Sequence, residues 1–545
     1  MKRLLLLTAC AAAAACSADW RDASLPPQKR AELLTAEMTL DEKIGQLTSP
    51  YGWEMYERHG DSVRLTDAFR EAVQNSHIGM LWGTFRADPW TQKDLRTGLT
   101  PQLAARLANR MQRYAVQHSR LGIPLFLAEE APHGHMAIGA TTFPTAPGQA
   151  STWNPELIER MGKVIAAEIR LQGGHICYGP VLDIVRDPRW SRTEESYGED
   201  RYLTARIGEA YVRGTGSGDL SQPRHALSTL KHFIAYGASE GGQNGGSNLL
   251  GERELRETYL PPFEAAVKAG ARSVMTAYNS VDGIPCTANR RMLTDILRGE
   301  WGFDGFVVTD WGADNDHALG VKNGSNLVMP APGPDAAIGL VNAVKEGRVS
   351  EADLDERLKE LFRVLVSADE AMKKAPKSFD KDAHHALARK CAEQSIVLLE
   401  NDGILPLDRN AVVGIIGDFA RNPRYQGAGS SMVNPTRLDN LYDCLRAAGV
   451  SIAGYAQGFD RRKPNPDQKL IDEAVRVAEA APVVLLCVGL DEIAESEGMD
   501  RSNMELSKGQ RELIEAVCKV NRNVVLVLSG GSPFVIPGSF RAAIH

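Results

Sequence analysis

An aspartate directly after a short apolar run is the residue of this chain best placed for chemistry. Asp310 follows the apolar residues 306–309 and precedes Trp311. A run of β-branched and aromatic residues after a glycine predicts a buried strand, and α/β barrels place their chemistry at the carboxyl ends of such strands. A carboxylate there can attack or stabilise an electrophilic carbon, and the indole beside it offers a flat face for a sugar ring. Taken alone, Asp310 would more simply cap the next helix.

Polar side chains also follow four other predicted strands at their carboxyl ends. These residues are Glu130, Asp183, Lys231 with His232, and Tyr278. A closed barrel brings all its strand ends to one face. Polar groups that converge from five separate strands therefore predict one site, and Asp310 belongs to it.

The elements that must position these residues alternate between strand and helix patterns. This alternation predicts a parallel sheet with helical crossovers, and about 250 residues of it is the size of one (β/α)8, or TIM-like, barrel. A further helix is predicted before it at 27–46. Strands are predicted at 78–82, 124–128, 175–178, 227–230, 273–277 and 305–310, and helices between them include 154–172 and 252–269.

A second α/β pattern follows a charged, helical stretch and predicts a doubly wound α/β sandwich domain. Its predicted strands are 395–399, 412–417, 483–489 and 524–529, and its predicted helices are 439–448 and 508–520. Because the pattern stops before the sheet is complete, we expect this domain to be truncated at its carboxyl end. The predicted organisation is a signal segment at 1–18, a barrel at 19–350, a helical linker at 351–394 and an incomplete sandwich at 395–545.

Composition and charge exclude several classes of function. The chain has 545 residues, of which 43% are hydrophobic, so it can bury more than one core. A net charge of -7 without a long basic run argues against a nucleic-acid partner. None of the eight cysteines belongs to a CxxC pair. The sequence therefore predicts no zinc site, and we expect neither a metal nor a cofactor.

The amino terminus has the layout of a targeting segment. Lys2 and Arg3 precede a leucine- and alanine-rich stretch, which is typical of a secretory signal and too short to span a membrane as a mature helix. Cys16 after three alanines resembles the processing site of bacterial lipoproteins, and ordinary cleavage near Ala18 is the alternative. We therefore expect an exported bacterial protein that is either periplasmic or an outer-membrane lipoprotein, and in the second case its only membrane contact is a lipid on Cys16.

A second candidate carboxylate lies in the loop 495–501, after the predicted strand 483–489. This loop contains Glu495 and Glu497. Hydrolysis of a glycosidic bond needs two carboxyl groups, one at the anomeric carbon and one that protonates the leaving oxygen. Asp310 suits the first role, and an acid from the second domain suits the other if that domain packs over the barrel mouth. The alternative is that this acidic loop only lies on the solvated surface and has no catalytic role.

Several stretches of the chain match the motifs of one known family, namely 179–183, 186–192, 197–200, 231–233, 277–279, 301–305, 309–311, 395–403 and 497–501. Together they resemble the family 3 glycoside hydrolases. The resemblance covers nearly all of the chain from residue 30 onward, and its motifs are specific in combination. It implies a barrel joined to an α/β sandwich, with retaining hydrolysis of β-glycosides from the non-reducing end.

The resemblance also implies roles for individual residues. Asp310 matches the nucleophile and Glu497 the general acid/base, with Glu495 as the rival for the acid. Arginine and lysine donate to sugar hydroxyls and keep nearby carboxylates ionised. Core packing is an equal alternative for Met275. The residues implied to bind the substrate are Glu130, Arg192, Lys231, His232, Arg253, Met275, Tyr278, Trp311 and Ser430.

The identity of the sugar remains open between two hypotheses. The resemblance favours an exo-acting β-glucosidase that removes terminal non-reducing β-D-glucose from oligosaccharides or glucosides by double displacement. Glu130 stands where many glucosidases of this family carry the shorter Asp. The longer side chain leaves less room for the sugar, so a β-xylosidase is the alternative. A truncated, non-catalytic sugar-binding homologue is a further alternative, and in each case the expected partner is a β-linked oligosaccharide or glycoside.

Overall fold

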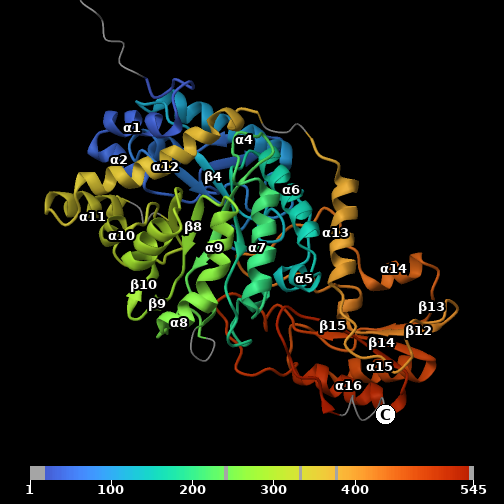
Figure 1. The fold of residues 1–545 in the computed structure, drawn as a ribbon. Coiled ribbons are helices and arrows are strands. Elements are labelled where there is room, and N and C mark those ends of the chain that lie inside the picture. The colour runs from blue at the N-terminus through green and yellow to red at the C-terminus, as the bar shows by residue number, and fades with distance from the viewer. Residues whose placement is uncertain (1–18, 239–242, 331–333, 375–377, 539–545) are drawn as a thin grey trace, which may run out of the picture.

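The computed structural model describes residues 19–238, 243–330, 334–374 and 378–538. Within these ranges the chain forms two α/β units, the first coloured blue to yellow and the second orange to red (Figure 1). The predicted signal segment and Cys16 fall outside the described residues. None of the helices in these ranges has the length and apolar composition needed to cross a membrane.

The first unit is built on a parallel sheet that has six strands in the described residues, in the order β11-β8-β6-β5-β4-β3. The strands are continuously buried, as in sheets that are covered on both faces. All six strands predicted from the sequence are confirmed, with ends shifted by a few residues. Their bounds are β3 Met80–Trp82, β4 Phe126–Glu130, β5 Ile176–Val181, β6 Leu227–Phe233, β8 Ser273–Thr276 and β11 Phe306–Thr309.

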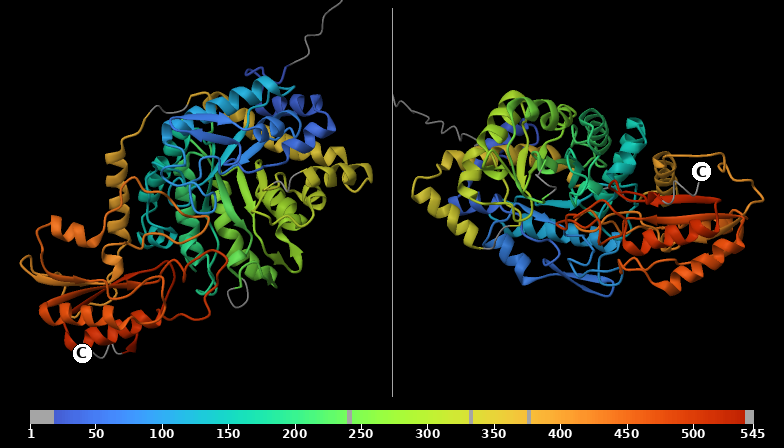
Figure 2. Two further views of the ribbon diagram at one scale, coloured as in Figure 1. Left: turned by 180° about the vertical axis from the view of Figure 1, so that it is seen from behind. Right: turned by 90° about the horizontal axis from the view of Figure 1, so that it is seen from below.

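Single parallel bridges continue the pairing beyond both edges of this sheet. Tyr51 pairs with Trp82 of β3, and Leu327 pairs with Val308 of β11. The two added segments also meet each other, because a third bridge joins positions 48 and 328. The sheet is therefore strongly curled, and helices surround it (Figure 2).

Helices alternate with these strands and follow local signals in the sequence. The predicted helix 154–172 is confirmed as α6, which Asn154 caps by accepting a hydrogen bond from the Leu157 amide. The predicted helix 27–46 divides in two, because Thr39 and Glu42 form a capping box that starts a second helix. The predicted helix 252–269 comprises α8, a π-helical turn at Leu255–Tyr259 and α9. Helix bounds in this unit are α1 Pro27–Glu37, α2 Leu40–Gln46, α3 Asp67–Gln74, α4 Pro101–His118, α5 Ala146–Ser151, α6 Pro155–Gln172, α7 Arg201–Thr215, α8 Glu252–Glu254, α9 Leu260–Lys268, α10 His317–Asn323 and α11 Pro334–Lys345, with a π-helix at Arg291–Glu300.

Short strands and one long helix complete the first unit. Helix α12 (Glu351–Met372) packs on α1, and its Leu358 and Phe362 join the core cluster that contains Phe306 of β11. Its apolar side is therefore part of the first unit's core. Helix α13 (Lys381–Ser395) then leads to the second unit (Figure 1). The short strands are β1 Tyr56–His59, β2 Ser62–Leu65, β7 Ser247–Asn248, β9 Ser280–Val281 and β10 Ile284–Pro285.

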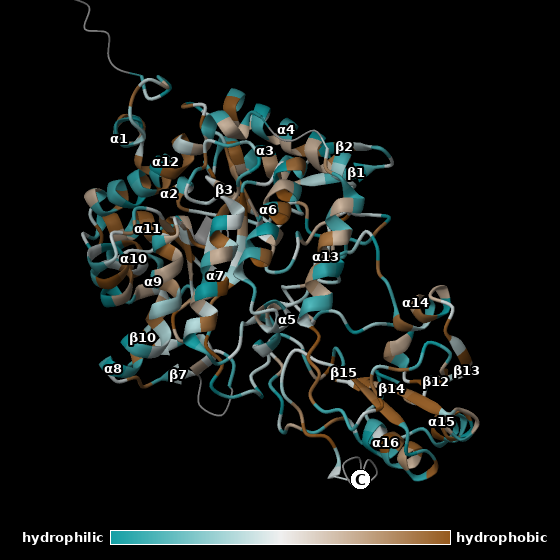
Figure 3. Ribbon diagram, turned by 45° about the vertical axis from the view of Figure 1, so that its right-hand side comes forward, coloured by the Kyte–Doolittle hydropathy of each residue, from teal (hydrophilic) through white to brown (hydrophobic). Residues whose placement is uncertain are grey.

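The second unit is a parallel sheet whose described strands run in the order β13-β12-β14-β15. Its strands are the apolar elements of this unit (Figure 3). The strands predicted at 412–417, 483–489 and 524–529 and the helices at 439–448 and 508–520 are confirmed, whereas β13 and α15 were not predicted. That this unit is truncated stays a prediction. The bounds are β12 Val412–Ile416, α14 Leu441–Ala447, β13 Ser451–Ala456, α15 Gln468–Ala480, β14 Val483–Gly489, α16 Lys508–Val520 and β15 Val524–Ser529.

The strand predicted at 395–399 is wrong. Helix α13 continues through Ser395, and the residues after it have no regular structure. Ile396 is 79% exposed and Leu399 is 76% exposed. An apolar run becomes a strand only where a neighbouring strand satisfies its backbone groups, and no strand of the described ranges pairs with this run.

Candidate active site

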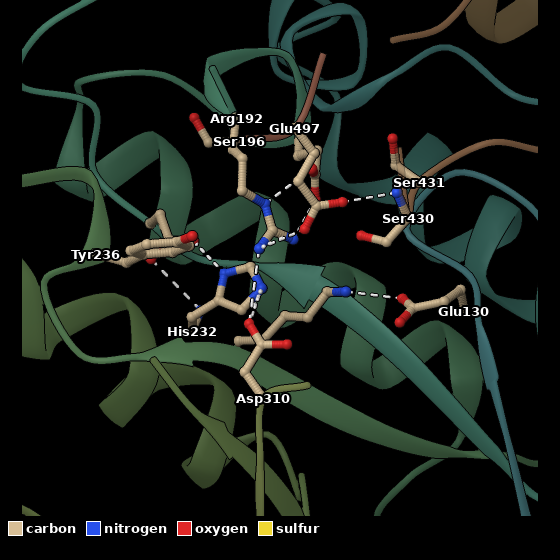
Figure 4. Close-up of polar contacts among 12 residues, drawn as sticks. Glu130, Arg192, Ser196, His232, Tyr236, Asp310, Ser430, Ser431 and Glu497 are labelled. Carbon is tan, nitrogen blue, oxygen red and sulfur yellow. Dashed lines mark hydrogen bonds and ion pairs between the residues drawn. The ribbon is translucent and has the colours of Figure 1, made fainter. Parts of the chain in front are cut away.

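Asp310 lies among charged side chains at the carboxyl end of β11. The residue is 6% exposed, and its Oδ1 accepts a hydrogen bond of 2.6 Å from the backbone N–H of Trp311. Its Oδ2 lies 3.5 Å from Nε2 of His232 and 3.6 Å from Nη1 of Arg192 (Figure 4). One oxygen is thus held by the backbone, and the other faces the polar cluster.

The guanidinium of Arg192 links the two candidate catalytic carboxylates. It is buried and donates two hydrogen bonds, of 2.9 and 2.8 Å, to Glu195. Its Nη1 lies 3.6 Å from Oδ2 of Asp310 and 3.1 Å from Oε1 of Glu497. Because both oxygens contact the same nitrogen, they are at most about 7 Å apart. The separation of about 5 to 5.5 Å found in retaining glycosidases lies within this limit.

Two loops of the second unit hold Glu497 in this position. The Ser430 amide donates a hydrogen bond of 2.7 Å to Oε2 of Glu497, and Ala428 forms a bridge with Ser496. Gly429 has a φ of +121°, and a Cβ there would lie 2.5 Å from the Cβ of Glu497. The close approach of the two loops therefore requires glycine at this position.

Asp500 fastens the same loop to the first unit. One carboxylate oxygen accepts a hydrogen bond of 2.9 Å from the Ser191 amide, and the other accepts one of 2.6 Å from the Asn244 amide. The Gly498 amide donates to the Ser191 hydroxyl at 3.1 Å. Two loops of the first unit, after β5 and β6, therefore also hold the loop that carries Glu497.

Glu495, the rival for the acid, is committed elsewhere. It is 3% exposed and lies 3.3 Å from the guanidinium of Arg424. It also accepts hydrogen bonds of 2.9 Å from the Gly531 amide and from the Ser532 hydroxyl. These partners all belong to the second unit, so Glu495 stabilises that unit, and Glu497 is the carboxylate that faces Asp310.

The strand-end residues of β4, β5 and β6 form two buried pairs beside Asp310. Nζ of Lys231 donates a hydrogen bond of 2.8 Å to Glu130. Nδ1 of His232 lies 2.7 Å from Oδ2 of Asp183. Burial raises the pKa of Glu130, although the ammonium of Lys231 opposes this. As predicted from the strand ends, these polar side chains gather on one face.

The remaining predicted substrate residues divide into near and far positions. Tyr278 donates its hydroxyl to the Trp311 carbonyl at 2.7 Å, so both lie beside Asp310. Met275 is buried in a core cluster, in agreement with the core alternative. Arg253 does not reach the cluster, because its side chain is 88% exposed on α8 and pairs with Glu257 one turn later. Its implied contact with a sugar hydroxyl is therefore not supported.

Sequence reasoning missed two members of this site, Glu195 and Trp90, and assigned no role to a third, Asp183. Glu195 holds Arg192, and the spacing of three residues on a short turn is the only local signal for that pair. Asp183 was expected at this face from its strand-end position, but without a role. Trp90 lies edge-on to Trp311, with ring centroids 4.9 Å apart, and nothing in its local sequence points to this neighbour. Within the described residues, no group of three or more histidine, cysteine, aspartate or glutamate side chains is arranged to hold a metal ion.

The two facing carboxylates differ in their electrostatic environment. Burial raises the pKa of Asp310 to about 6, although Arg192 and Lys231 oppose this effect. Burial also acts to raise the pKa of Glu497, but Arg192 and the hydrogen bonds from Ser430 outweigh it, and this pKa is lowered. The nearer contact of Arg192 with Glu497 and the hydrogen bonds from Ser430 account for the difference, because an opposite charge and hydrogen bonds to the carboxylate both favour the ionised form.

Comparisons with known proteins agree with this arrangement. The profile described as glycosyl hydrolase family 3 N terminal domain matches residues 39–364, and the profile described as glycosyl hydrolase family 3 C-terminal domain matches residues 396–544. The chain belongs to glycoside hydrolase family 3. The resemblance inferred from the sequence motifs is thereby confirmed.

Individual relatives carry names of β-glycosidases. The chain is 39% identical to thermostable beta-glucosidase B of Acetivibrio thermocellus over 77% of its own length and 57% of that relative. It is 30% identical to the periplasmic beta-glucosidase of Salmonella typhimurium over 94% of its length and 69% of the relative. It is 34% identical to a beta-xylosidase of Formosa agariphila over 78% of its length and 65% of the relative.

Solved structures show the same fold. The crystal structure of a beta-glucosidase from Listeria innocua in complex with isofagomine matches with a TM-score of 0.80 and 27% sequence identity, over 95% of this chain and 71% of that one. The chain thus spans between somewhat more than half and about two thirds of the length of the relatives named here.

Proposed function

We propose that this chain is a retaining, exo-acting β-glycosidase that removes terminal non-reducing β-D-glucose from oligosaccharides or glucosides. Asp310 is the nucleophile in this proposal and Glu497 the general acid/base. The observation that carries it is that two carboxylates from different units both contact Nη1 of Arg192, at 3.6 and 3.1 Å. The upper limit of about 7 Å that these contacts set on the two oxygens is compatible with a double displacement through a covalent glycosyl-enzyme.

The neighbours of the pair suit the chemistry of a sugar. Trp311 fixes Asp310 through a backbone hydrogen bond, which leaves the other oxygen for attack on the anomeric carbon. Lys231 and Glu130 present a charged donor and acceptor to hydroxyls farther along the ring. The Ser430 amide orients Glu497 toward the leaving oxygen. Trp311 offers its ring to the apolar face of the sugar or of the group attached to it.

Substrate binding must also prepare the acid. Glu497 has to carry the proton, and Asp310 the charge, when the glycosidic bond breaks. Without a sugar in place, the pKa of Asp310 is raised and that of Glu497 is lowered. The proton would then lie on Asp310 more readily than on Glu497, which is the opposite of what the reaction needs. A sugar between the two carboxyls separates Glu497 from Arg192 and from water, and both changes raise the pKa of Glu497.

The direct test replaces each carboxylate in turn. Asp310→Ala should abolish release of 4-nitrophenol from the aryl β-glucoside. Glu497→Ala should slow release of poor leaving groups far more than that of 2,4-dinitrophenol, and added azide should restore turnover as glucosyl azide. Glu495→Gln serves as the matched control, because it changes a carboxylate two residues away that faces the second unit. Undiminished activity in Asp310→Ala would refute the proposal.

Hydrolysis of β-xylosides is the second candidate. Glu130 lies beside Lys231 at the inner face of the site, and its length is expected to crowd the hydroxymethyl group of a hexose. The relative from Formosa agariphila is named a beta-xylosidase. The ratio of kcat/KM for 4-nitrophenyl β-glucoside and β-xyloside decides between the two. Calorimetry that shows glycoside binding without turnover would instead favour a non-catalytic homologue.

We also infer the finer fold and the location of the protein. The segments near 48–51 and 327–328 would act as the first and last strands of a (β/α)8 barrel, since single bridges already pair them with each other and with both sheet edges. The first domain would include α12, because this helix packs into its core. The charged and apolar amino-terminal segment supports export, and the relative from Salmonella typhimurium is named periplasmic.

A further inference from the structure

His232 is held between two carboxylates, one behind it and one in the candidate site. Its Nδ1 lies 2.7 Å from Oδ2 of Asp183, and its backbone N–H points to Oδ1 of the same residue at 3.4 Å. Its Nε2 lies 3.5 Å from Oδ2 of Asp310. Asp183 and His232 are both buried, so within the described residues these contacts decide where the protons lie.

With Asp310 ionised, which is its main form at pH 7 since its pKa is about 6, the contact favours a hydrogen on Nε2. Without that hydrogen, the lone pair of Nε2 would face a carboxylate oxygen at 3.5 Å, which is repulsive. In the part of the chain that the structure describes, neither Nε2 of His232 nor Oδ2 of Asp310 has a hydrogen-bond partner, so their approach to 3.5 Å is an electrostatic contact between two unpaired polar atoms. An Nε2–H donor is therefore the arrangement that fits both atoms.

Only two protonation states place a hydrogen on Nε2 of His232 and also form a hydrogen bond between Nδ1 and Asp183. In one, His232 is a cationic imidazolium and Asp183 is ionised. In the other, His232 is neutral and Asp183 is a carboxylic acid that donates to Nδ1. Arg192 and Lys231 lie close enough to repel a third positive charge, and burial together with these cations holds the pKa of His232 well below its usual range.

The surroundings of Asp183 favour the neutral state. Burial raises the pKa of Asp183 to about 8, against the effect of Arg192. Among the described residues, the titratable and charged groups that face the pair are Arg192 and Glu195 from the segment after β5, Lys231 from β6, Tyr236 from the turn after β6, Cys286 from the turn after β10 and Asp310 from β11. The two acids among them oppose ionisation of Asp183, so they act in the same direction as burial.

We propose that Asp183 is a positioning residue that works as a protonated acid, donates to Nδ1 of His232 and thereby fixes the Nε2–H form that faces Asp310. In this arrangement His232 remains a donor throughout the reaction. It donates to Oδ2 of Asp310 or to a sugar hydroxyl that displaces this contact. The proposal rests on the proposed glycosidase function for its role in turnover, but not for the proton positions themselves.

Two substitutions of Asp183 distinguish this state from the ionised one. Asp183→Asn matches a carboxylic acid, because its amide N–H₂ can donate to Nδ1 while its oxygen accepts the backbone N–H of His232. We expect kcat on the aryl glucoside within about tenfold of the unchanged enzyme. Asp183→Leu has the same branched shape but no donor or acceptor, and we expect a loss of about 100-fold, because buried groups are left unpaired.

An ionised Asp183 predicts the opposite order of effects. In catalytic triads, where the aspartate is ionised, replacement by asparagine costs about 10⁴-fold because the histidine takes the wrong tautomer. A loss of that size in Asp183→Asn, equal to or larger than that in Asp183→Leu, would overturn the proposal. The pH dependence of kcat gives a second kinetic test. Deprotonation of Asp183 should lower kcat at alkaline pH, and this alkaline limb should move or vanish in Asp183→Asn because asparagine does not titrate.

Nitrogen NMR of the whole chain with ¹⁵N-labelled histidine tests the proton positions without reference to activity. The signals of His232 are assigned by their loss in His232→Asn. Neutral His232 protonated at Nε2, at pH 7 and in both the unchanged protein and Asp183→Asn, supports the proposal. An imidazolium signal or an Nδ1–H tautomer overturns it. If the unchanged protein hydrolyses no glycoside, the proposed function fails, and this measurement still decides the proposal.

Discussion

Removal of the charge of Arg192 should move the pH dependence of hydrolysis to higher pH. The guanidinium lies 3.6 Å from Asp310, and opposite charges about 4 Å apart attract by about 4 kcal/mol at an effective dielectric constant near 20. At 1.36 kcal/mol per pKa unit this is about three units. The pKa of Asp310, about 6 with Arg192 present, would rise toward 9 as an upper limit.

Replacement of Arg192 also removes the hydrogen-bond partner of the Glu195 carboxylate, so Glu195 must be replaced in the same variant. Glu195 accepts two hydrogen bonds from Arg192, and an unpaired buried charge costs about 3 to 5 kcal/mol. The variant to measure is therefore Arg192→Gln combined with Glu195→Gln, two neutral side chains that can bond to each other. Glu195→Gln alone is the matched control.

The assay is kcat/KM against pH on 2,4-dinitrophenyl β-glucoside, whose leaving group needs no proton. On this substrate the acid limb reports ionisation of the nucleophile in the free enzyme. A rise of three units would lower the ionised fraction of Asp310 at pH 7 from about 90% to about 1%, which is a loss of about 100-fold. An acid limb at the same pH in the double variant and in the control would refute the reasoning.

Three further results are expected. Asp183→Asn should raise the free energy of unfolding by up to about 4 kcal/mol at pH 7 and hardly at all at pH 4. The pKa of Asp183 is about 8 in the folded state and near 3.9 in the unfolded state. The aspartic acid therefore lowers stability increasingly as the pH rises between these two values, and asparagine does not. Urea denaturation at pH 4 and pH 7 checks this, and a loss of stability at both would contradict it. Gly429→Ala should slow an alkyl glucoside by about 100-fold through displacement of Glu497 and spare the dinitrophenyl glucoside; equal losses on both substrates would count against that role. Glu130→Asp should raise the ratio of kcat/KM for glucoside over xyloside by about tenfold or more, and an unchanged ratio would separate this residue from sugar choice.

The local pattern of the sequence was sufficient for most of the elements and for half of the site. Short continuous apolar runs predicted all six strands of the first sheet, because strands buried on both faces must be apolar throughout. The polar residues that end those runs, such as Lys231 and His232, reach one face because parallel strands of a curled sheet all end there. The motif resemblance supplied Glu497, which no periodicity distinguishes from an ordinary surface acid.

What only the tertiary structure decided are the directions of side chains and the partners they meet. Glu495 and Glu497 are two residues apart in one loop, and the Ser430 amide and the Arg424 guanidinium, both distant in sequence, determine which one faces Asp310. Arg253 looked equivalent to Arg192 but lies in solvent. The apolar run after α13 looked like a strand but has no partner among the described strands. Burial and charge depend on residues that are far apart in the chain, so the raised pKa of Asp310 follows from the folded site and not from the residues beside it in the sequence.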